Sequence, residues 1–469
     1  MSDMAQRQGN TILGHPKGLF FLAFTEMWER FSFYGMRGLL ILYMVQDLLI
    51  SDRVNDVAGM DAYRRAITAI FGPLSTQAFA SRTFGLYAGF VYFTPLFGGL
   101  LADRWLGAKK TVMIGIALMT LGHFAMVFDW SFLIALLLLV LGSGALKGNI
   151  AAQVGHLYPK AAEALRTRGY TLFSTGINVG AVLGPLACGT LAQIYGWHYG
   201  FALAGVMMLV AAAVYFAGMR HFPDHRVRPA DGSAPPLAGS DWRMIGLIGL
   251  IMVFMTFQFL AYDQSFNVGL IWVADHVRLE TAIGAVPVPW FAAEDSLASV
   301  VVVPVLIGLW QWQARRGSEP GDLGKMAIGA VIMACAMLAL AAGATLSGEG
   351  NKASIVWPVL AYFLTGAAFM WTWPTMLALM SRRAPAGINA LMMACVYLTA
   401  FVSSVGAGFI ARWYEPLGAA PFFLLNAGIA LAGAALLAIF GPALRRAMDR
   451  HDQPGKSAPV ASSLVASAE

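Results

Sequence analysis

Twelve stretches of this chain are apolar for long enough to cross a lipid bilayer, and this pattern constrains the fold more than any other feature. A spanning helix needs about 20 consecutive, mostly apolar residues. Stretches of this kind lie at 18–47, 83–102, 108–128, 131–153, 169–193, 198–219, 243–274, 293–314, 324–346, 354–380, 387–411 and 419–441. Only 12% of the residues are charged, about half the usual share of a soluble domain. The sequence therefore predicts an all-α, multi-pass membrane protein with twelve transmembrane helices.

The basic residues are distributed unequally between the two sides that this topology defines. If the N-terminus is cytoplasmic, 21 of the 31 Lys and Arg residues fall in cytoplasmic segments, seven fall outside, and three lie inside helices. Such a bias is the usual signal of orientation. We therefore predict a plasma (inner) membrane protein with both termini in the cytoplasm. The net charge of +6 then reflects topology rather than a nucleic-acid partner, since no basic patch lies on a soluble domain.

A segment rich in Pro, Gly, Ser and charge divides the twelve stretches into six and six. We predict an N-terminal six-helix bundle at 1–220, a cytoplasmic linker at 221–242, a C-terminal six-helix bundle at 243–446 and a disordered cytoplasmic tail at 447–469. A weak internal repeat supports two related halves, because three residues recur at an offset of 209: Pro95, Gly99 and Leu100 as Pro304, Gly308 and Leu309. The first outside loop is expected to contain a short amphipathic helix around 58–71.

Four charged residues stand within twelve positions of the first apolar stretch, FTEMWERFSFYGMRGLL: Glu26, Glu29, Arg30 and Arg37. At 100° per residue they fall within one arc of the helix. Each costs about 2.5–3.5 kcal/mol to insert into a membrane. One interpretation is a structural set of ion pairs, with Glu26 and Arg30 anchoring the helix in its bundle. We favour a binding surface that also titrates, because an arginine offers a fork for a carboxylate and a glutamate beside it exchanges a proton.

Other ionisable residues also lie in or next to the apolar stretches. Lys147 in the fourth stretch either extends to the membrane surface or is a buried lysine that changes its protonation readily. Asp263 in the seventh stretch is a natural counter-charge for a first-helix arginine. Glu294 and Asp295, at the start of the eighth stretch, are equally well explained as an acidic pair in an outside loop.

Tyr92 and Asn178 bring single polar groups into apolar helices, where each serves packing or binding about equally well. The three cysteines lie in apolar runs and are expected to be packing residues. Neither a His/Cys cluster with metal spacing nor a Ser–His–Asp arrangement is recognisable. We therefore predict no cofactor, no metal and no enzyme activity, and an ion channel is disfavoured because the charges do not form repeated rings.

Several of these motifs together resemble the proton-dependent oligopeptide transporter family of the major facilitator superfamily. The resemblance covers nearly the whole chain, and the first-helix pattern Glu26-x-x-Glu29-Arg30-Phe31-x-x-Tyr34-Gly35-x-Arg37 is its most specific part. The other matching motifs are GGLLADRWLGAKK at 98–110, GALKGN with Lys147, INVGA with Asn178, Tyr262-Asp263-Gln264, and Ala384-Pro385-Ala386 with Met392-Met393. The resemblance implies the major facilitator fold.

The resemblance also implies a function: a symporter that imports di- and tripeptides with protons by alternating access. Its partners would be small peptides, protons and the lipid bilayer, with no obligate protein partner evident. The implied roles fall into three groups. Arg30 and Lys147 would serve the peptide carboxylate, with Tyr34, Tyr92 and Asn178 lining the site. Glu26 and Glu29 would carry the proton, and Arg37 with Asp263 would form an outer gate that protonation of Asp263 weakens. These assignments make Glu26, Glu29, Arg30, Lys147 and Asp263 the predicted proton-coupling residues.

Some positions depart from the family pattern. A tenth-helix glutamate usually stands five residues before a proline and holds the peptide amine, but Phe369 stands five residues before Pro374. Asp295 occupies a position where the family has asparagine. We therefore predict that Asp295 binds the amine and that Lys147 pairs with a first-helix glutamate. Further departures are Gly148, Ser174 and Val396, where the family has proline, tyrosine and tryptophan. A facilitator or exporter of another small solute is the alternative function.

Overall fold

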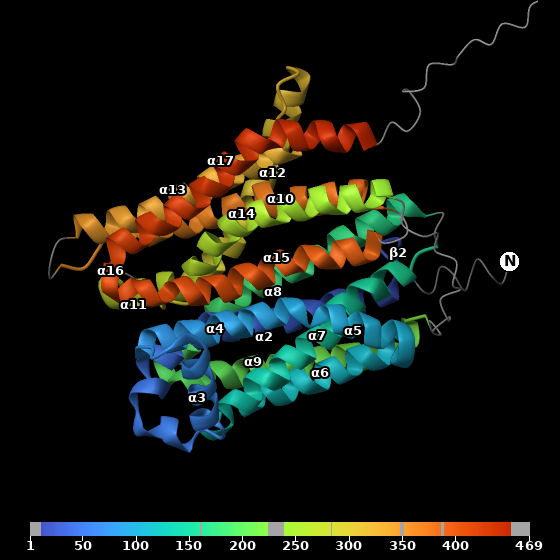
Figure 1. The fold of residues 1–469 in the computed structure, drawn as a ribbon. Helices are drawn as coiled ribbons and strands as arrows, with labels where there is room; N and C mark the ends of the chain where they lie inside the picture. The colour runs from blue at the N-terminus through green and yellow to red at the C-terminus, as the bar shows by residue number, and fades with distance from the viewer. Residues whose placement is uncertain are drawn as a thin grey trace, which may run out of the picture.

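The computed structural model describes residues 11–159, 162–223, 239–282, 284–347, 351–385 and 389–451, and long helices packed side by side make up most of them (Figure 1). The first half contains β1 (Thr11–Ile12), β2 (His15–Pro16), α2 (Lys17–Gln46), α3 (Met60–Phe71), α4 (Thr76–Phe93), α5 (Pro95–Leu101), η3 (Ala102–Leu106), α6 (Gly107–Ala125), α7 (Phe132–His156), α8 (Glu163–Tyr195) and α9 (Trp197–Gly218), with short 3₁₀ turns η1 (Leu48–Ile50), η2 (Asp52–Asp56), η4 (Asp129–Ser131) and η5 (Met219–His221).

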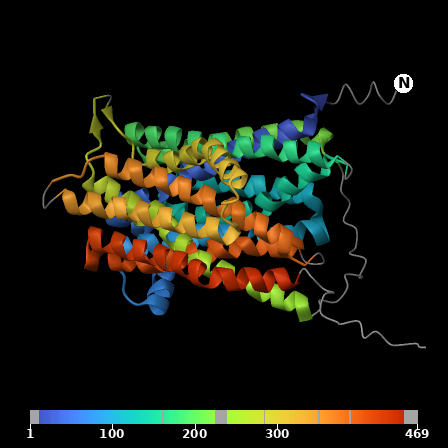
Figure 2. The same cartoon turned by 90° about the horizontal axis from the view of Figure 1, so that it is seen from above.

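The second half has the same helical character. It contains α10 (Gly239–Gln264), η6 (Ser265–Gly269), α11 (Leu270–His276), α12 (Trp290–Arg315), α13 (Asp322–Leu346), α14 (Val356–Arg383), α15 (Asn389–Ile410), η8 (Ala411–Trp413), α16 (Tyr414–Leu417) and α17 (Ala419–His451), with a small hairpin of β3 (Glu280–Thr281) and β4 (Gly284–Ala285). The hairpin and α3 lie at one end of the bundle, and β2 lies at the other (Figures 1 and 2). We call the end with α3 the outer end and the opposite one the basic end.

The described residues contain eleven stretches that are long and apolar enough to cross a membrane. One of them, Thr76–Ala125, has 50 residues and would be about 75 Å long as a straight helix, more than twice the thickness of a hydrocarbon core. It turns back at Gly107, whose φ of +77° is readily adopted only by glycine. Helices α4–α5 and α6 therefore cross separately, so the described part of the chain makes the twelve predicted crossings of a multi-pass membrane protein.

The helices exceed the predicted stretches mainly at the basic end. Helix α8 begins at Glu163, before the predicted 169, and α17 continues to His451, beyond the predicted bundle end at 446. Residues 224–238 of the predicted linker and 452–469 of the predicted tail lie outside the described residues. The predicted amphipathic helix around 58–71 is confirmed as α3.

Helices α2 and α8 approach each other closely because glycines on α8 recur every fourth residue. A Cβ atom on Gly180 would lie 2.1 Å from the carbonyl oxygen of Met27, and one on Gly184 would lie 2.2 Å from that of Phe31. Spacing of this kind allows two helix backbones to touch inside a membrane. The contact sets the charged face of α2 beside the part of α8 that carries Asn178.

We expect Gly180→Ala to destabilise the protein strongly, because the added methyl group has no space between α2 and α8. Overpacking of this kind costs about 1–3 kcal/mol in a packed interior. The control is Gly246→Ala on α10, where a Cβ atom would meet no heavy atom within 4 Å. Thermal unfolding in detergent should show a lower midpoint for Gly180→Ala alone, and equal midpoints would contradict the packing argument.

The two halves are closed against each other at the outer end. A Cβ atom on Gly85 of α4 would lie 2.5 Å from the carbonyl oxygen of Ser404 of α15. Across a second contact, Trp290 Nε1 of α12 donates to the carbonyl oxygen of Leu186 of α8 at 3.2 Å. Asn267 also donates from its Nδ2 atom to a backbone oxygen of α4, at 3.3 Å. These contacts exclude an open path to the outer end in this conformation.

The apolar stretch predicted at 83–102 left Arg82 in the outer loop, as one of the seven outside basic residues, and this prediction was wrong. It belongs to α4, is only 1% exposed, and lies between the rings of Phe71 (4.1 Å) and Phe409 (4.6 Å). Among the described residues, none of its three guanidinium nitrogens has a hydrogen-bond partner. The helix begins earlier than the apolar stretch does, so hydropathy alone placed Arg82 outside it.

Candidate functional site

A cavity of about 520 Å³ lies between the two halves. Helices α2, α4, α5, α7 and α8 supply its walls from the first half, and α10, α14 and α15 supply them from the second. It extends from Arg37 and Asp263 to Ala151, Phe173 and Leu377. The last three lie toward the basic end, where α7 and α14 finish and α8 begins. The cavity is therefore a central site, closed on the outer side, that reaches toward the basic end.

The cavity brings together most of the residues that the sequence singled out. Eight of the ten predicted site residues line it: Glu26, Arg30, Tyr34, Arg37, Tyr92, Lys147, Asn178 and Asp263. Glu29 and Asp295 do not line it. Six of these eight predicted residues come from α2, α4 and α7, so they gather on one side of the cavity.

Arg30 joins both glutamates of the first-helix motif. Its Nε atom lies 3.1 Å from Glu26 Oε1 and also forms an ion pair with Glu29 Oε2. Glu29 is fully buried, whereas Glu26 and Arg30 face the cavity. One oxygen of each glutamate and the Arg30 Nη2 atom have no partner within the described part of the chain. A single guanidinium thus neutralises two carboxylates. An anion that binds Arg30 would weaken its ion pairs with both glutamates and so change how readily each binds a proton.

The predicted ion pair between Lys147 and a first-helix glutamate is absent. The Lys147 Nζ atom lies over the rings of Phe33 (4.3 Å) and Tyr92 (4.8 Å), and among the described residues it has no carboxylate within 4.0 Å. Arg30, rather than Lys147, is the cation that pairs with both glutamates. Lys147 faces the cavity rather than the membrane surface, which excludes the snorkelling interpretation.

The predicted contact between Arg37 and Asp263 is present and links the two halves. Arg37 Nη2 lies 3.3 Å from Asp263 Oδ1, and both residues are nearly buried. The hydroxyls of Ser403 and Ser404 donate to Asp263 Oδ2 at 2.8 and 2.9 Å. Both carboxylate oxygens are therefore already bound. The two serines were missed from the sequence, because nothing in an apolar helix indicates which serine meets a carboxylate.

Asp295 lies inside α12 rather than in a loop, and it is buried behind Tyr262. The Tyr262 hydroxyl donates to Asp295 Oδ2 at 3.2 Å, and Tyr262, not Asp295, lines the cavity. Asp295 Oδ1 has no partner in the described part of the protein. In this conformation a ligand amine in the cavity therefore meets the tyrosine before it meets the acid.

The second half presents mostly aromatic rings to the cavity. Phe369 lines it and stacks on Trp373 at 5.8 Å between centroids. Trp373 in turn contacts Tyr397 at 5.6 Å. Phe369 and Trp373 are four residues apart on α14, a spacing that places both on one helix face. This spacing in FMWTW could have indicated an aromatic face from the sequence.

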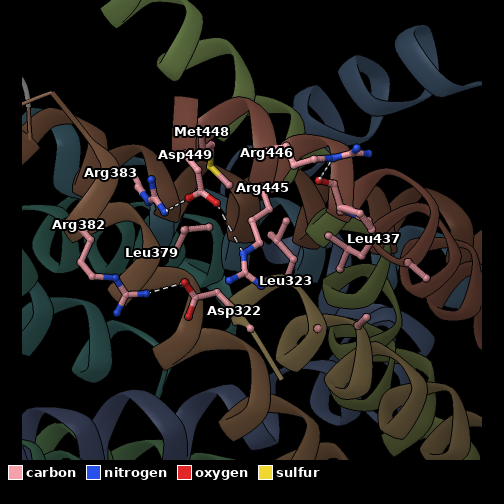
Figure 3. A pocket seen from close by; sticks show the side chains of 16 residues that line it. Asp322, Leu323, Leu379, Arg382, Arg383, Leu437, Arg445, Arg446, Met448 and Asp449 are labelled. Carbon is pink, nitrogen blue, oxygen red and sulfur yellow. Dashed lines mark hydrogen bonds and ion pairs between the residues drawn. The ribbon is translucent and has the colours of Figure 1, made fainter. Parts of the chain in front are cut away.

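A second cavity, of about 920 Å³, lies between α13, α14 and α17 (Figure 3). Four of its charged residues form two salt bridges: Arg382 with Asp322 at 2.5 Å, and Arg383 with Asp449 at 2.6 Å. All of its lining residues belong to the second half of the chain. It therefore does not lie between the halves and is not the candidate site.

Comparison with known proteins identifies the family and the fold. A sequence model of the POT family matches residues 109–233 and 238–418. The di-/tripeptide transporter of Lactococcus lactis subsp. cremoris is 27% identical, over 93% of this chain and 97% of the relative. Peptide transporter YePEPT of Yersinia enterocolitica is 28% identical, over 94% and 97%. A crystal structure of peptide transporter POT in complex with sulfate has a TM-score of 0.82 at 24% identity, over 93% and 97% of the two chains. This likeness confirms the predicted major facilitator fold.

Proposed function

Because this chain belongs to the POT family, whose proton-dependent oligopeptide transporters its motifs resemble, we propose that it imports di- and tripeptides together with protons by alternating access. The observation that carries the proposal is the cavity between the halves, which holds acids and bases and is closed at the outer end. The names of the two relatives, a di-/tripeptide transporter and a peptide transporter, support the substrate class. We place the protein in the plasma (inner) membrane, with the basic end in the cytoplasm.

Arg30 and Lys147 receive the peptide carboxylate in this proposal. The Lys147 ammonium lies over the rings of Phe33 and Tyr92 and has no ion-pair partner among the described residues, so it can accept an anion without first losing an ion pair. Arg30 offers Nη2, which has no partner among the described residues. Tyr34, Tyr92 and Asn178 border the same space and supply hydrogen bonds to the peptide backbone.

Proton coupling follows from competition for Arg30. A peptide carboxylate that binds Arg30 weakens its hold on Glu26 and Glu29, and a carboxylate that loses a cationic partner binds a proton more readily. At the outer end, protonation of Asp263 removes the charge that holds Arg37. The closed conformation then loses the Arg37–Asp263 ion pair. The open conformation does not contain this ion pair and loses nothing, so the equilibrium shifts toward opening.

Uptake by purified protein in proteoliposomes tests this function. We expect a dipeptide to accumulate inside when an inward proton gradient, with the interior negative, is imposed, and accumulation to stop when a protonophore collapses the gradient. A facilitator would equilibrate the peptide without accumulating it, and an exporter would lower its internal concentration. Either result would overturn the proposal of a proton-coupled importer.

A further inference from the structure

The charges of the central cavity are almost all on one side. Among the described residues that line it, the first half contributes Glu26, Arg30, Arg37 and Lys147, whereas the second half contributes one charged residue, Asp263. Asp263 is not available to a ligand, because Arg37, Ser403 and Ser404 already occupy its two oxygens. A substrate ammonium that enters the second half therefore finds no free carboxylate among the described residues that line it.

Aromatic side chains line the second half's side of the cavity, and we call them the aromatic wall. Tyr262 packs on Phe369 with ring centroids 5.5 Å apart, and Phe369 stacks on Trp373 with an angle of 14° between the rings. Phe259 and Tyr397 extend the wall through edge contacts with Trp373, at 5.7 and 5.6 Å. Within this wall, Tyr262 lines the cavity and hydrogen-bonds Asp295, which does not line it.

Aromatic walls recognise ligands differently from carboxylates. Large flat rings bind other rings and apolar groups by burying area and by stacking. They attract an ammonium group only weakly at a hydrated site, and they bind a neutral acyl group in the same place without an electrostatic penalty. The two sides of the cavity thus fit a ligand with an anion at one end and a bulky apolar group at the other.

We propose that this cavity selects substrates by a carboxylate and an aromatic or bulky apolar first residue, and that it does not require a free α-amine. The proposal rests on the proposed function for the transport step. Under it, peptides with an aromatic first residue are preferred substrates, N-acylated peptides bind as well as free ones, and N-acyl aromatic amino acids are ligands. The carboxylate lies at Arg30 and Lys147, and the aromatic residue lies against Phe369 and Trp373.

Binding measured on the purified full chain, for example by thermal shift and by competition for uptake, tests the proposal with five compounds. We expect Phe-Ala and N-acetyl-Phe-Ala to bind within about threefold of each other, and Ala-Ala to bind about tenfold more weakly than either, as expected for a large side chain lost from a pocket. Phe-Ala amide should lose binding because it lacks the carboxylate. N-acetyl-phenylalanine, which is not a peptide with a free amine, should bind.

Two variants of α14 with a matched control assign the effect to the wall. Trp373→Ala should remove the preference for Phe-Ala over Ala-Ala. Phe369→Glu should favour the free peptide over its acetylated form by about tenfold, because an ion pair to the amine becomes possible. Phe363→Ala removes a ring from the exposed face of the same helix and should change neither ratio.

The possible results of these binding experiments separate the selectivity inference from the proposed peptide symport. If acetylation of Phe-Ala abolishes binding to the unchanged protein, an acid recognises the amine and the inference is wrong. Equal binding of Ala-Ala and Phe-Ala also overturns it. If N-acetyl-phenylalanine binds with the expected preference but no peptide accumulates under a proton gradient, the selectivity stands and the proposed peptide symport fails. Loss of binding by all five compounds would overturn both.

Discussion

Replacement of Glu29 by glutamine is expected to abolish the gradient-driven accumulation of dipeptide while leaving exchange of peptide across the membrane intact. Glu29 is fully buried and shares Arg30 with Glu26. Glutamine has the same shape but cannot carry a proton. A gradient of one pH unit supplies about 1.4 kcal/mol per proton, which corresponds to about tenfold accumulation. The variant should lose this factor entirely and bring the peptide only to equal concentrations.

Counterflow, which needs no proton drive, is the measurement that separates coupling from binding. Proteoliposomes loaded with unlabelled dipeptide should exchange it for external labelled dipeptide in Glu29→Gln as in the unchanged protein. Glu26→Gln should behave in the same direction, whereas Lys147→Ala should weaken peptide binding as well. The matched control is Glu319→Gln, which neutralises an acid of the loop before α13 that pairs with Lys325. Gradient-driven accumulation by Glu29→Gln would refute its role in coupling.

Asp263→Asn is expected to open the outer end of the protein. The change leaves Arg37, which is 5% exposed, without its counter-charge while the outer end is closed. Removal of one partner of a buried ion pair costs at least about 3 kcal/mol, or roughly a hundredfold change in the ratio of closed to open molecules. Spin labels on exposed Asp61 of α3 and Glu415 of α16 report this ratio, in a background without Cys335 and Cys395. Their distance should increase.

Two further variants make the measurement specific. Arg37→Gln combined with Asp263→Asn replaces the ion pair by two neutral amides and should restore the short distance between the labels. Asp322→Asn makes the same chemical change at the basic end, where its partner Arg382 is solvent-exposed, and should leave the distance unchanged. An unchanged distance in Asp263→Asn itself would show that the Arg37–Asp263 contact does not hold the outer end closed.

The membrane helices could be predicted closely because hydropathy directly reports burial in lipid. The stretches predicted at 18–47, 198–219 and 324–346 end within two residues of α2, α9 and α13. Hydropathy does not detect the polar turns of a helix that extends beyond the membrane. The first turns of α8 and the last turns of α17 were therefore not predicted. It also misplaced Arg82, since a charge in the first turns of a helix reads as a loop residue.

The site was predictable where one helix carries the information. The charged face of α2 follows from its helical period alone, and the structure brings Glu26, Arg30 and Arg37 to one cavity. Contacts between helices were not predictable in the same way. The position of Lys147 depends on Phe33 and Tyr92 from two other helices.

Asp295 shows the same limit on the other side of the cavity. Counting along the chain placed it at a binding position, but the Tyr262 side chain of α10 donates to it and lines the cavity in its place.

The burial of Arg82 is expected to destabilise the conformation in which the outer end is closed. Its guanidinium is held between a ring from α3 and a ring from α15, which belong to different halves, without a hydrogen-bond partner in the described part of the chain. A cation in this situation is poorly solvated, and separation of the halves would return it to water. We therefore expect closure to be a balance in which the Arg37–Asp263 ion pair stabilises the closed state and the burial of Arg82 destabilises it. In this arrangement, neutralisation of Asp263 alone is expected to favour opening of the outer end.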